Sequence, residues 1–143
     1  MPVLTDPQGW FTLQVPDGWG MATEDSVTTL RRPGAAGIVY VSGARHSRGR
    51  QPSFGGADFL ARFLKSLGLQ VDEGAIASAA GPGCRIYSHR SSTSEADWWF
   101  WSVTDDETAL LISYARPIGH SGEMDAVDGM VRSVRLYHST PVH

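Results

Sequence analysis

The sequence predicts an α+β domain in which a twisted antiparallel β-sheet of about six strands packs with two main helices. Three observations support this class: several short β-rich segments, two segments with apolar residues at helical spacing, and the order βββ-α-βββ-α. The chain has 143 residues, of which 41% are hydrophobic, enough for one domain with its own core. We expect a single domain over residues 1–143, with loosely ordered ends at residues 1–9 and 137–143.

The first three predicted strands lie in the N-terminal third of the chain. They are Trp10–Val15, Val27–Arg31 and Ile38–Ser42, each rich in β-branched or aromatic residues. The second and third are separated by Pro33–Gly37, so we expect them to form a hairpin with a loop longer than two residues. A connection rich in Gly, Ser, Arg and Pro, Gly43–Gly56, follows them.

The next segment, Asp58–Leu67, changes to helical spacing. Its acidic first residue has the sign that a helix N-terminus favours, and Gly68 is a suitable stop. One stripe of the predicted helix carries the apolar residues Phe59, Leu60, Phe63, Leu64 and Leu67. The residues after this helix predict a short strand at Leu69–Val71 and then a loose Ala/Gly connection, Gly74–Gly83, that holds at most one strand edge.

Three stronger strands and a second helix complete the prediction. The strands are Cys84–Ser91, Ala96–Thr104 and Thr108–Arg116, and the acidic turn between the last two makes them an antiparallel hairpin. The helix is Glu123–Arg135, with Ser121 as its expected N-cap. Its apolar face consists of Met124, Val127, Met130, Val131 and Val134.

Two segments resemble a known family. Phe11–Trp19 reads Phe-Thr-Leu-Gln-Val-Pro-Asp-Gly-Trp and resembles the opening F-x-L-x-x-P-x-G-W pattern of the PsbP-like superfamily. Val127–Leu136, with Ser133 near its end, resembles the closing helix of that superfamily. The group includes the oxygen-evolving photosystem subunit, a eukaryotic Ran-binding transport factor and bacterial Eag-type secretion chaperones. The resemblance implies a bacterial member with a twisted antiparallel sheet, helices on its faces and a role in binding proteins, and it supplies no shared catalytic set.

Composition excludes several functional classes. The single cysteine, Cys84, excludes an internal disulfide framework and any metal site built from several cysteines. The net charge of -3 argues against a nucleic-acid-binding role, because domains with that role are usually strongly basic. No apolar run approaches the roughly 18 residues that a membrane-spanning helix needs. Met1–Gly9 lacks the features of a secretory signal, so we expect a cytoplasmic protein.

The residues suited to chemistry form no coherent set. Gly119–Glu123 begins like the Gly-x-Ser-x-Gly elbow of serine hydrolases, but Glu123 stands where that elbow needs a small residue. We therefore interpret Ser121 as a helix cap. The histidines lack the spacing of metal ligands. The sequence predicts no catalytic residue, no metal site and no cofactor.

The sequence contains an uneven distribution of arginine. Eleven of the twelve basic residues are arginines. Five of them, Arg31, Arg32, Arg45, Arg48 and Arg50, lie between Ser26 and Ala57, a stretch that contains no acidic residue. Guanidinium groups bind carboxylates and phosphates through paired hydrogen bonds, so the loop that holds Arg45, Arg48 and Arg50 could contact an anion or an acidic partner. The alternative is an ordinary exposed polar loop.

A run of aromatic residues lies in one predicted strand. Side chains alternate along a strand, so Trp98 and Phe100 share one face while Trp99 and Trp101 share the other. Two helices that cover one face each would bury all of these rings. Two helices on the same face would instead leave an aromatic surface exposed, and such surfaces mark binding sites.

These features give one leading hypothesis for function. We expect a non-catalytic protein-binding, scaffold or chaperone-like module that uses an aromatic sheet face with the arginine loop as its rim. The residues assigned to partner binding are Tyr87, Trp98, Phe100, Arg45, Arg48 and Arg50.

Two alternatives remain open. The first is a small-molecule or anion binder, with or without enzymatic activity, whose cleft between sheet and loop contains Arg45, His89 and Arg90. The second is a homodimer that uses the Trp-rich face as its subunit interface.

Overall fold

The computed structural model describes residues 3–6, 8–45, 58–69, 73–81, 83–105, 108–119 and 123–137. Within them two antiparallel sheets form. The large sheet contains, in spatial order, β3 (Gly20–Glu24), β4 (Val27–Arg31), β5 (Ile38–Arg45), β9 (Thr108–Pro117), β8 (Ala96–Thr104), β7 (Cys84–Ser92) and β6 (Ala77–Gly81). The small sheet contains β1 (Val3–Thr5), β2 (Phe11–Gln14) and β10 (Arg135–Leu136), in the order β1-β2-β10. The helices are α1 (Asp58–Ser66), the short 3-10 helix η1 (Glu73–Ala75) and α2 (Met124–Arg132).

The predicted α+β class and both predicted hairpins are confirmed. β4 pairs with β5, and β8 pairs with β9 over nine residue pairs from Ala96–Pro117 to Thr104–Ala109. The sheet is larger than expected because β3 and β6 flank the predicted strands as its two edges. Both edge strands are rich in Gly, Ala, Ser or Thr and are mostly exposed, so they carry neither the propensity nor the apolar alternation that identifies a strand.

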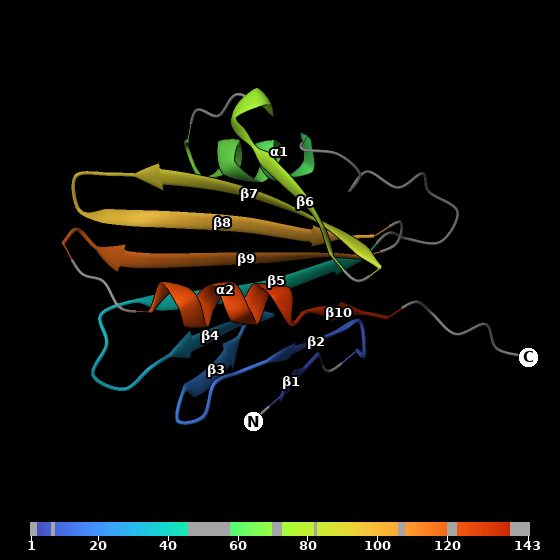
Figure 1. Ribbon diagram of the computed structural model, residues 1–143, viewed down its shortest axis with the longest axis horizontal. Helices are drawn as coiled ribbons and strands as arrows, with labels where there is room; N and C mark the ends of the chain where they lie inside the picture. The colour runs from blue at the N-terminus through green and yellow to red at the C-terminus, as the bar shows by residue number, and fades with distance from the viewer. Residues whose placement is uncertain are drawn as a thin grey trace, which may run out of the picture.

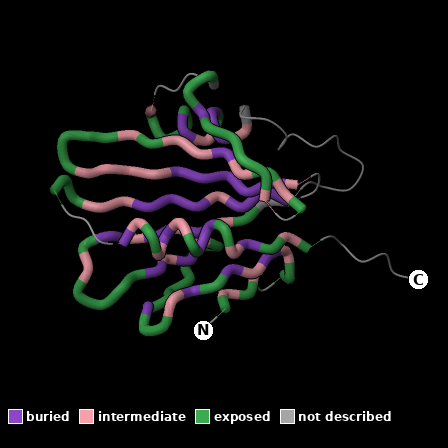
Figure 2. Tube along the Cα trace, viewed as in Figure 1, coloured by how far each residue is buried: buried purple, intermediate pink, exposed green. Residues whose placement is uncertain are grey.

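The two helices cover opposite faces of the large sheet, as Figure 1 shows with α2 in front and α1 behind. The α2 face, shared with β2 of the small sheet, carries the main core. Its fully buried members include Leu13, Leu30, Leu110 and Ile112. Figure 2 shows the buried residues running along β8, β9 and the inner side of α2. The α1 face carries a second, smaller core.

The motif at the start of the chain is structural. Phe11, Leu13 and Trp19 are all buried in the main core. Gly18 has a φ of +86°, in the region that favours glycine, and it completes the turn in which the Trp19 N–H donates to Pro16 O at 3.4 Å. The F-x-L-x-x-P-x-G-W pattern therefore encodes a buried strand followed by a tight turn.

The closing helix is anchored at both ends, to β2 at its C-terminus and to β9 at its N-terminus. At its C-terminus the Ser133 hydroxyl accepts a hydrogen bond from the Gln14 N–H at 2.9 Å and donates to Met130 O at 2.6 Å. At its N-terminus Glu123 is the N-cap and makes no side-chain cap bond. The predicted cap, Ser121, lies outside the described residues. Instead, the buried Glu123 carboxylate accepts a hydrogen bond from the Tyr114 hydroxyl at 3.2 Å.

Parts of the two ends predicted as loosely ordered take part in the fold. Val3–Thr5 forms β1 and pairs with β2, and the Tyr137 N–H donates to Trp10 O at 2.9 Å. Residues 1, 2, 7 and 138–143 lie outside the described part of the chain, as do the residues between Leu69 and Glu73 that complete the predicted strand there. No described helix is long and apolar enough to cross a membrane.

Candidate functional site

The aromatic residues of β8 divide between the two faces as strand alternation requires. Trp99 and Trp101 pack against the main core on the α2 side. Phe100 faces α1 and is 1% exposed, and Tyr87 on the neighbouring β7 is 8% exposed in the same small core. The interpretation that one helix covers each face is therefore the correct one.

Two of the residues assigned to partner binding, Tyr87 and Phe100, are instead core residues. Tyr87 and Phe100 lie beneath α1, where Leu60 and Leu64 are fully buried against the sheet. The expectation that they present a free aromatic face is wrong, because the apolar stripe of α1 requires a partner and these rings supply it.

Trp98 differs from Tyr87 and Phe100 because it is only half-buried at the edge of this small core. Its ring stacks on Phe100 with centroids 5.6 Å apart and on Tyr40 of β5 at 6.3 Å. β9 runs between β5 and β8, and there Ser113 and Ala115 lie opposite Phe100 and Trp98. These small residues leave room for the large rings to meet above the central strand. We call Tyr40, Trp98 and Phe100 the aromatic row.

An apolar hollow lies beside the aromatic row, on the α1 side of the large sheet. A second hollow, of about 450 Å³, lies on the α2 side and is more polar. The apolar hollow has a volume of about 270 Å³ and lies between the sheet and the C-terminal end of α1. Its lining residues are Leu67, Leu69, Thr93, Trp98 and Phe100. Leu67 is 53% exposed although it is a large apolar residue, so the hollow has an open apolar rim. Such a site suits an apolar side chain of a partner.

The arginine loop is only partly described. The backbone of Arg45 ends β5, where it pairs with Thr108 of β9. Arg48 and Arg50 lie outside the described residues. Their assignment to the rim of a binding surface stays a prediction.

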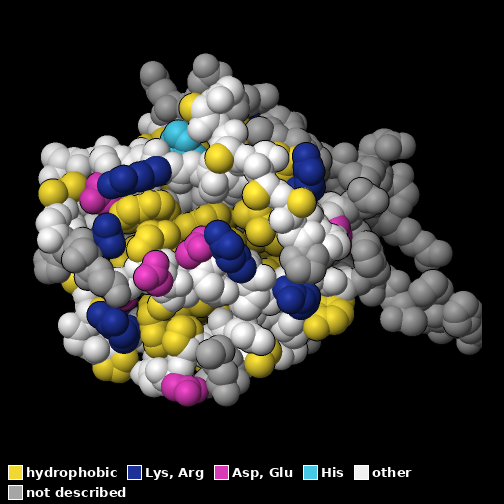
Figure 3. Space-filling model, viewed as in Figure 1, with side chains coloured by type: hydrophobic (Ala, Val, Ile, Leu, Met, Phe, Trp, Pro, Cys, Tyr) yellow, Lys and Arg dark blue, Asp and Glu magenta, His cyan; other side chains and the backbone are white. Residues whose placement is uncertain are grey.

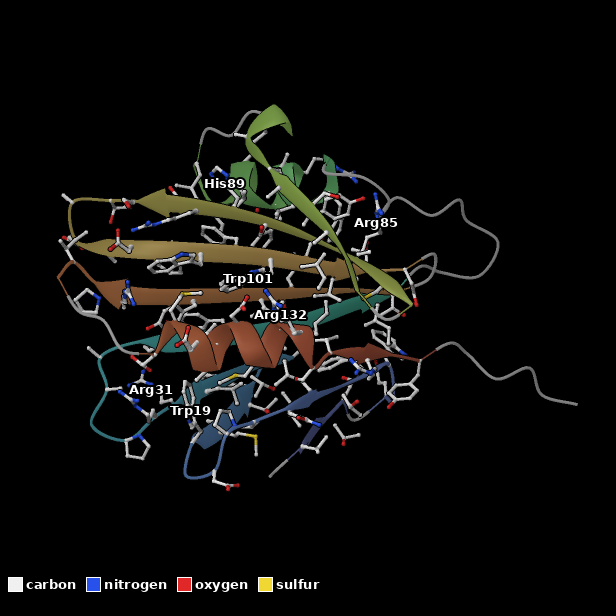
Figure 4. All side chains as sticks on the ribbon, viewed as in Figure 1. Trp19, Arg31, Arg85, His89, Trp101 and Arg132 are labelled. Carbon is white, nitrogen blue, oxygen red and sulfur yellow. The ribbon has the colours of Figure 1, made fainter. Side chains whose placement is uncertain are left out.

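The residues of the predicted small-molecule cleft do not come together. His89 lies opposite Phe100 and Arg90 lies opposite Trp99, so these two neighbours belong to different faces of β7. Arg45 is on β5, separated from β7 by β9 and β8. Figure 4 shows His89 beside α1, whereas Trp101 belongs to the main core on the α2 side of the sheet.

The structure instead places Arg90 in a cation–aromatic arrangement that the sequence did not reveal. The guanidinium of Arg90 lies 4.9 Å from the Trp99 ring centroid, and that of Arg116 lies 4.6 Å from it. Asp97 is 3.8 Å from Arg90 and balances its charge. These contacts hold Trp99 against Tyr114, at a centroid distance of 5.5 Å.

Two groups on the α2 side have shifted pKa values. Burial raises the pKa of the Tyr114 hydroxyl, and the nearby Glu123 carboxylate raises it further, because both disfavour a phenolate. Burial also raises the pKa of the Cys84 thiol, with Asp105 adding to the effect and Arg135 opposing it. A thiol with a raised pKa is a poor nucleophile at neutral pH, so Cys84, which packs against the main core, is suited to packing and not to catalysis.

The metal-ligating residue types do not gather in the part of the chain that the structure describes. There, no group of three or more His, Cys, Asp or Glu side chains is arranged to hold a metal ion.

Comparisons with known proteins were made for sequence and for structure. The scan of protein-family models and the search of curated proteins find no match. The structure resembles the solution structure of cyanobacterial PsbP (CyanoP) from Synechocystis sp. PCC 6803, with a TM-score of 0.68 over 95% of this chain and 92% of that one. The chain has a PsbP-like fold. The sequence identity to CyanoP is 14%, so the likeness concerns the fold alone.

A second structure extends this comparison. A crystal structure from Bacteroides thetaiotaomicron VPI-5482 has a TM-score of 0.71 and 14% identity to this PsbP-like domain. The alignment covers 95% of this chain but 48% of that one, so the domain spans about half the length of the Bacteroides protein.

Proposed function

We propose that this PsbP-like domain is a non-catalytic protein-binding module whose partner inserts an apolar side chain into the hollow beside Trp98. The observation that carries the proposal is the position of Trp98: half-buried and stacked on Phe100 at 5.6 Å, at an opening whose rim is the exposed Leu67. The proposal keeps the leading hypothesis from the sequence and confines its aromatic surface to Trp98 and the residues around it.

The physical properties of this site suit a protein partner. Stacking between Tyr40 and Phe100 restricts the Trp98 ring before binding, so little side-chain entropy remains to be lost when a partner covers it. Tryptophan is also among the residues that contribute most to the free energy of protein association. An apolar side chain in the hollow would remove Leu67 and Trp98 from water.

The arginines that precede α1 in the chain add an electrostatic attraction for the partner. Arg45 pairs with Thr108 of β9, whereas Trp98 lies opposite Ala115 near the other end of that strand, so these arginines would attract an acidic partner over a distance and act mainly on the association rate. We place this function in the cytoplasm of a bacterium, as the sequence predicts.

Site-specific photo-crosslinking tests the proposal. A benzoylphenylalanine residue is introduced at Leu67, on the rim of the hollow, and in a matched control at Met21, which is 48% exposed on the distant edge strand β3. In cells that produce the protein naturally, we expect a discrete crosslinked complex from position 67 and none from position 21. Mass spectrometry then identifies the partner.

The outcomes separate the proposal from its alternatives. A crosslink from both positions in equal yield would show contact without a site, and none from position 67 would contradict the proposal. A crosslinked product made of two copies of this chain would replace the hetero-partner with a homodimer on the Trp98 face.

A further inference from the structure

The edge strand β6 has an unusual sequence for its position. It reads Ala77-Ser-Ala-Ala-Gly81 and contains no charged residue, no proline and no side chain larger than serine. Alanine, serine and glycine are weak strand formers, so β6 owes its conformation to pairing with β7 along its whole length, from Ala77–Ser88 to Gly81–Cys84.

β6 is also an open edge. It is the last strand of the large sheet, and within the described part of the chain no other strand pairs with its outer side. Ala77, Ser78, Ala79 and Ala80 are all exposed. An edge strand leaves alternate N–H and C=O groups unpaired, and natural proteins usually protect such edges with charges, prolines or bulges. The opposite edge strand, β3, carries the charged Glu24, whereas β6 has no such protection.

A hollow of about 450 Å³ follows β6 on the α2 side of the sheet. Its apolar surface is formed by Ile86, Trp101 and Val131, and its rim by Asp128 and Arg132, which form an ion pair at 3.0 Å. Figure 3 shows apolar side chains gathered between α2 and the strands above it, and Figure 4 shows Trp101 and Arg132 at this place. A strand added beside β6 would cover part of this apolar surface.

We infer that a second copy of this chain pairs with β6, so that two β6 strands run antiparallel across a two-fold axis and join two large sheets into one. Pairing centred on Ala79 places this residue opposite its own copy, Ala77 opposite Gly81, and Ser78 opposite Ala80. A charged residue on such an axis would meet an identical charge, and β6 contains none. The rim does not oppose the approach either, because the charges of Asp128 and Arg132 cancel.

The same residues favour a second copy over a foreign strand. β6 offers only methyl, hydroxymethyl and hydrogen groups, which can meet their own copies across a two-fold axis without steric or charge conflict. Two strands of five residues pair over about 17 Å. This contact is small, so we expect a weak and reversible dimer.

Sedimentation equilibrium on the purified chain tests the inference. Between about 5 and 500 µM, the wild type should pass from monomer to dimer. Ala79→Lys places two ammonium groups opposite each other at the axis and should raise the dissociation constant at least about 30-fold. The matched control Thr23→Lys introduces the same charge on the other edge strand, β3, and should dimerise like the wild type, as should Trp98→Ala on the face used by the proposed function.

Amide hydrogen exchange gives a second measurement that does not depend on any substitution. Protection of the amides of residues 77–81 should rise with protein concentration, while that of β3 should stay constant. A wild-type chain that remains monomeric at about 500 µM, an Ala79→Lys variant that dimerises like the wild type, or a dimer that Trp98→Ala abolishes would each overturn the inference. Protection of residues 77–81 only in the presence of another protein would overturn it as well, in favour of a foreign strand.

Discussion

Trp98 and Phe100 occupy the same face of one strand, two residues apart, yet they have different roles. Phe100 is 1% exposed beneath α1, whereas Trp98 stands half-exposed where α1 ends. The first stabilises the fold, and the second retains surface that a partner can cover. This difference depends on where a nine-residue helix stops.

The two residues should respond differently to truncation. Phe100→Ala leaves a cavity in the small core and should lower the free energy of unfolding by about 3 to 5 kcal/mol. Trp98→Ala removes a partly solvated ring and should lower it by about 1 to 2 kcal/mol, which leaves the protein folded. Urea unfolding followed by circular dichroism measures both values. Equal losses would contradict the assignment of Trp98 to the surface.

Tyr114 should give the stability of the protein a specific pH dependence. Its pKa in the folded state is raised above the usual value near 10. The hydroxyl therefore contributes fully to stability at pH values below about 10, where it is neutral in both states. This contribution is lost as the pH rises through 10 toward the higher folded pKa. Between about pH 8 and pH 11, the wild type should therefore lose more stability than Tyr114→Phe, which has no group to ionise. Urea unfolding at both pH values is the measurement, and parallel losses would show that Tyr114 does not titrate differently in the two states.

At the scale of elements, α2 is held by contacts at both ends rather than by its own propensity. A nine-residue helix is too short to be stable alone. Its N-terminus is fixed by Glu123, Tyr114 and the backbone of Gly37, and its C-terminus by the hydrogen bond between Ser133 and Gln14. The resemblance between Val127–Leu136 and the closing helix of the PsbP-like superfamily thus includes an anchoring residue.

The attachment of α2 can be tested with two glycines. A Cβ at Gly37 would lie 2.5 Å from Tyr114 Cε1 and 2.9 Å from Glu123 Oε1, so Gly37→Ala must displace these buried groups and should cost about 1 to 3 kcal/mol of stability. A Cβ at Gly129, inside α2, would meet nothing within 4 Å, so Gly129→Ala should stabilise the protein by about 0.5 to 1 kcal/mol. Thermal unfolding compares the two. The anchoring role of Gly37 fails if both variants shift the melting temperature in the same direction.

The elements also show how far the sequence predicts this structure. The predicted bounds of the strands Val27–Arg31 and Ala96–Thr104 are the observed ones. Both segments are rich in β-branched or aromatic residues, which favour strands and which tertiary contacts then bury. β6 could not be predicted as a definite strand, since its small residues depend on the pairing with β7. The site has the same limit: the sequence identifies the aromatic residues and their alternation, but not the face that α1 covers or the meeting of Trp98 with Tyr40 across β9.

At the scale of the whole molecule, the layering explains why so many aromatic residues are compatible with one domain. The large sheet is covered by α2 and the small sheet on one face and by α1 on part of the other, so both faces of the β8–β9 hairpin contribute to a core. The sheet is left uncovered at two places, the hollow beside Trp98 and the open edge at β6. The net charge of -3 hides the cluster of arginines that precedes α1 in the chain.

The proposed function places the partner at Trp98. Isothermal titration calorimetry with the partner identified by crosslinking measures this contact in the wild type, in Trp98→Ala and in the exposed control Met21→Ala. If the ring is the main contact, Trp98→Ala should raise the dissociation constant at least about 30-fold, equivalent to about 2 kcal/mol, while Met21→Ala leaves it unchanged. If a folded Trp98→Ala variant binds the partner as tightly as the wild type, the partner does not bind at Trp98.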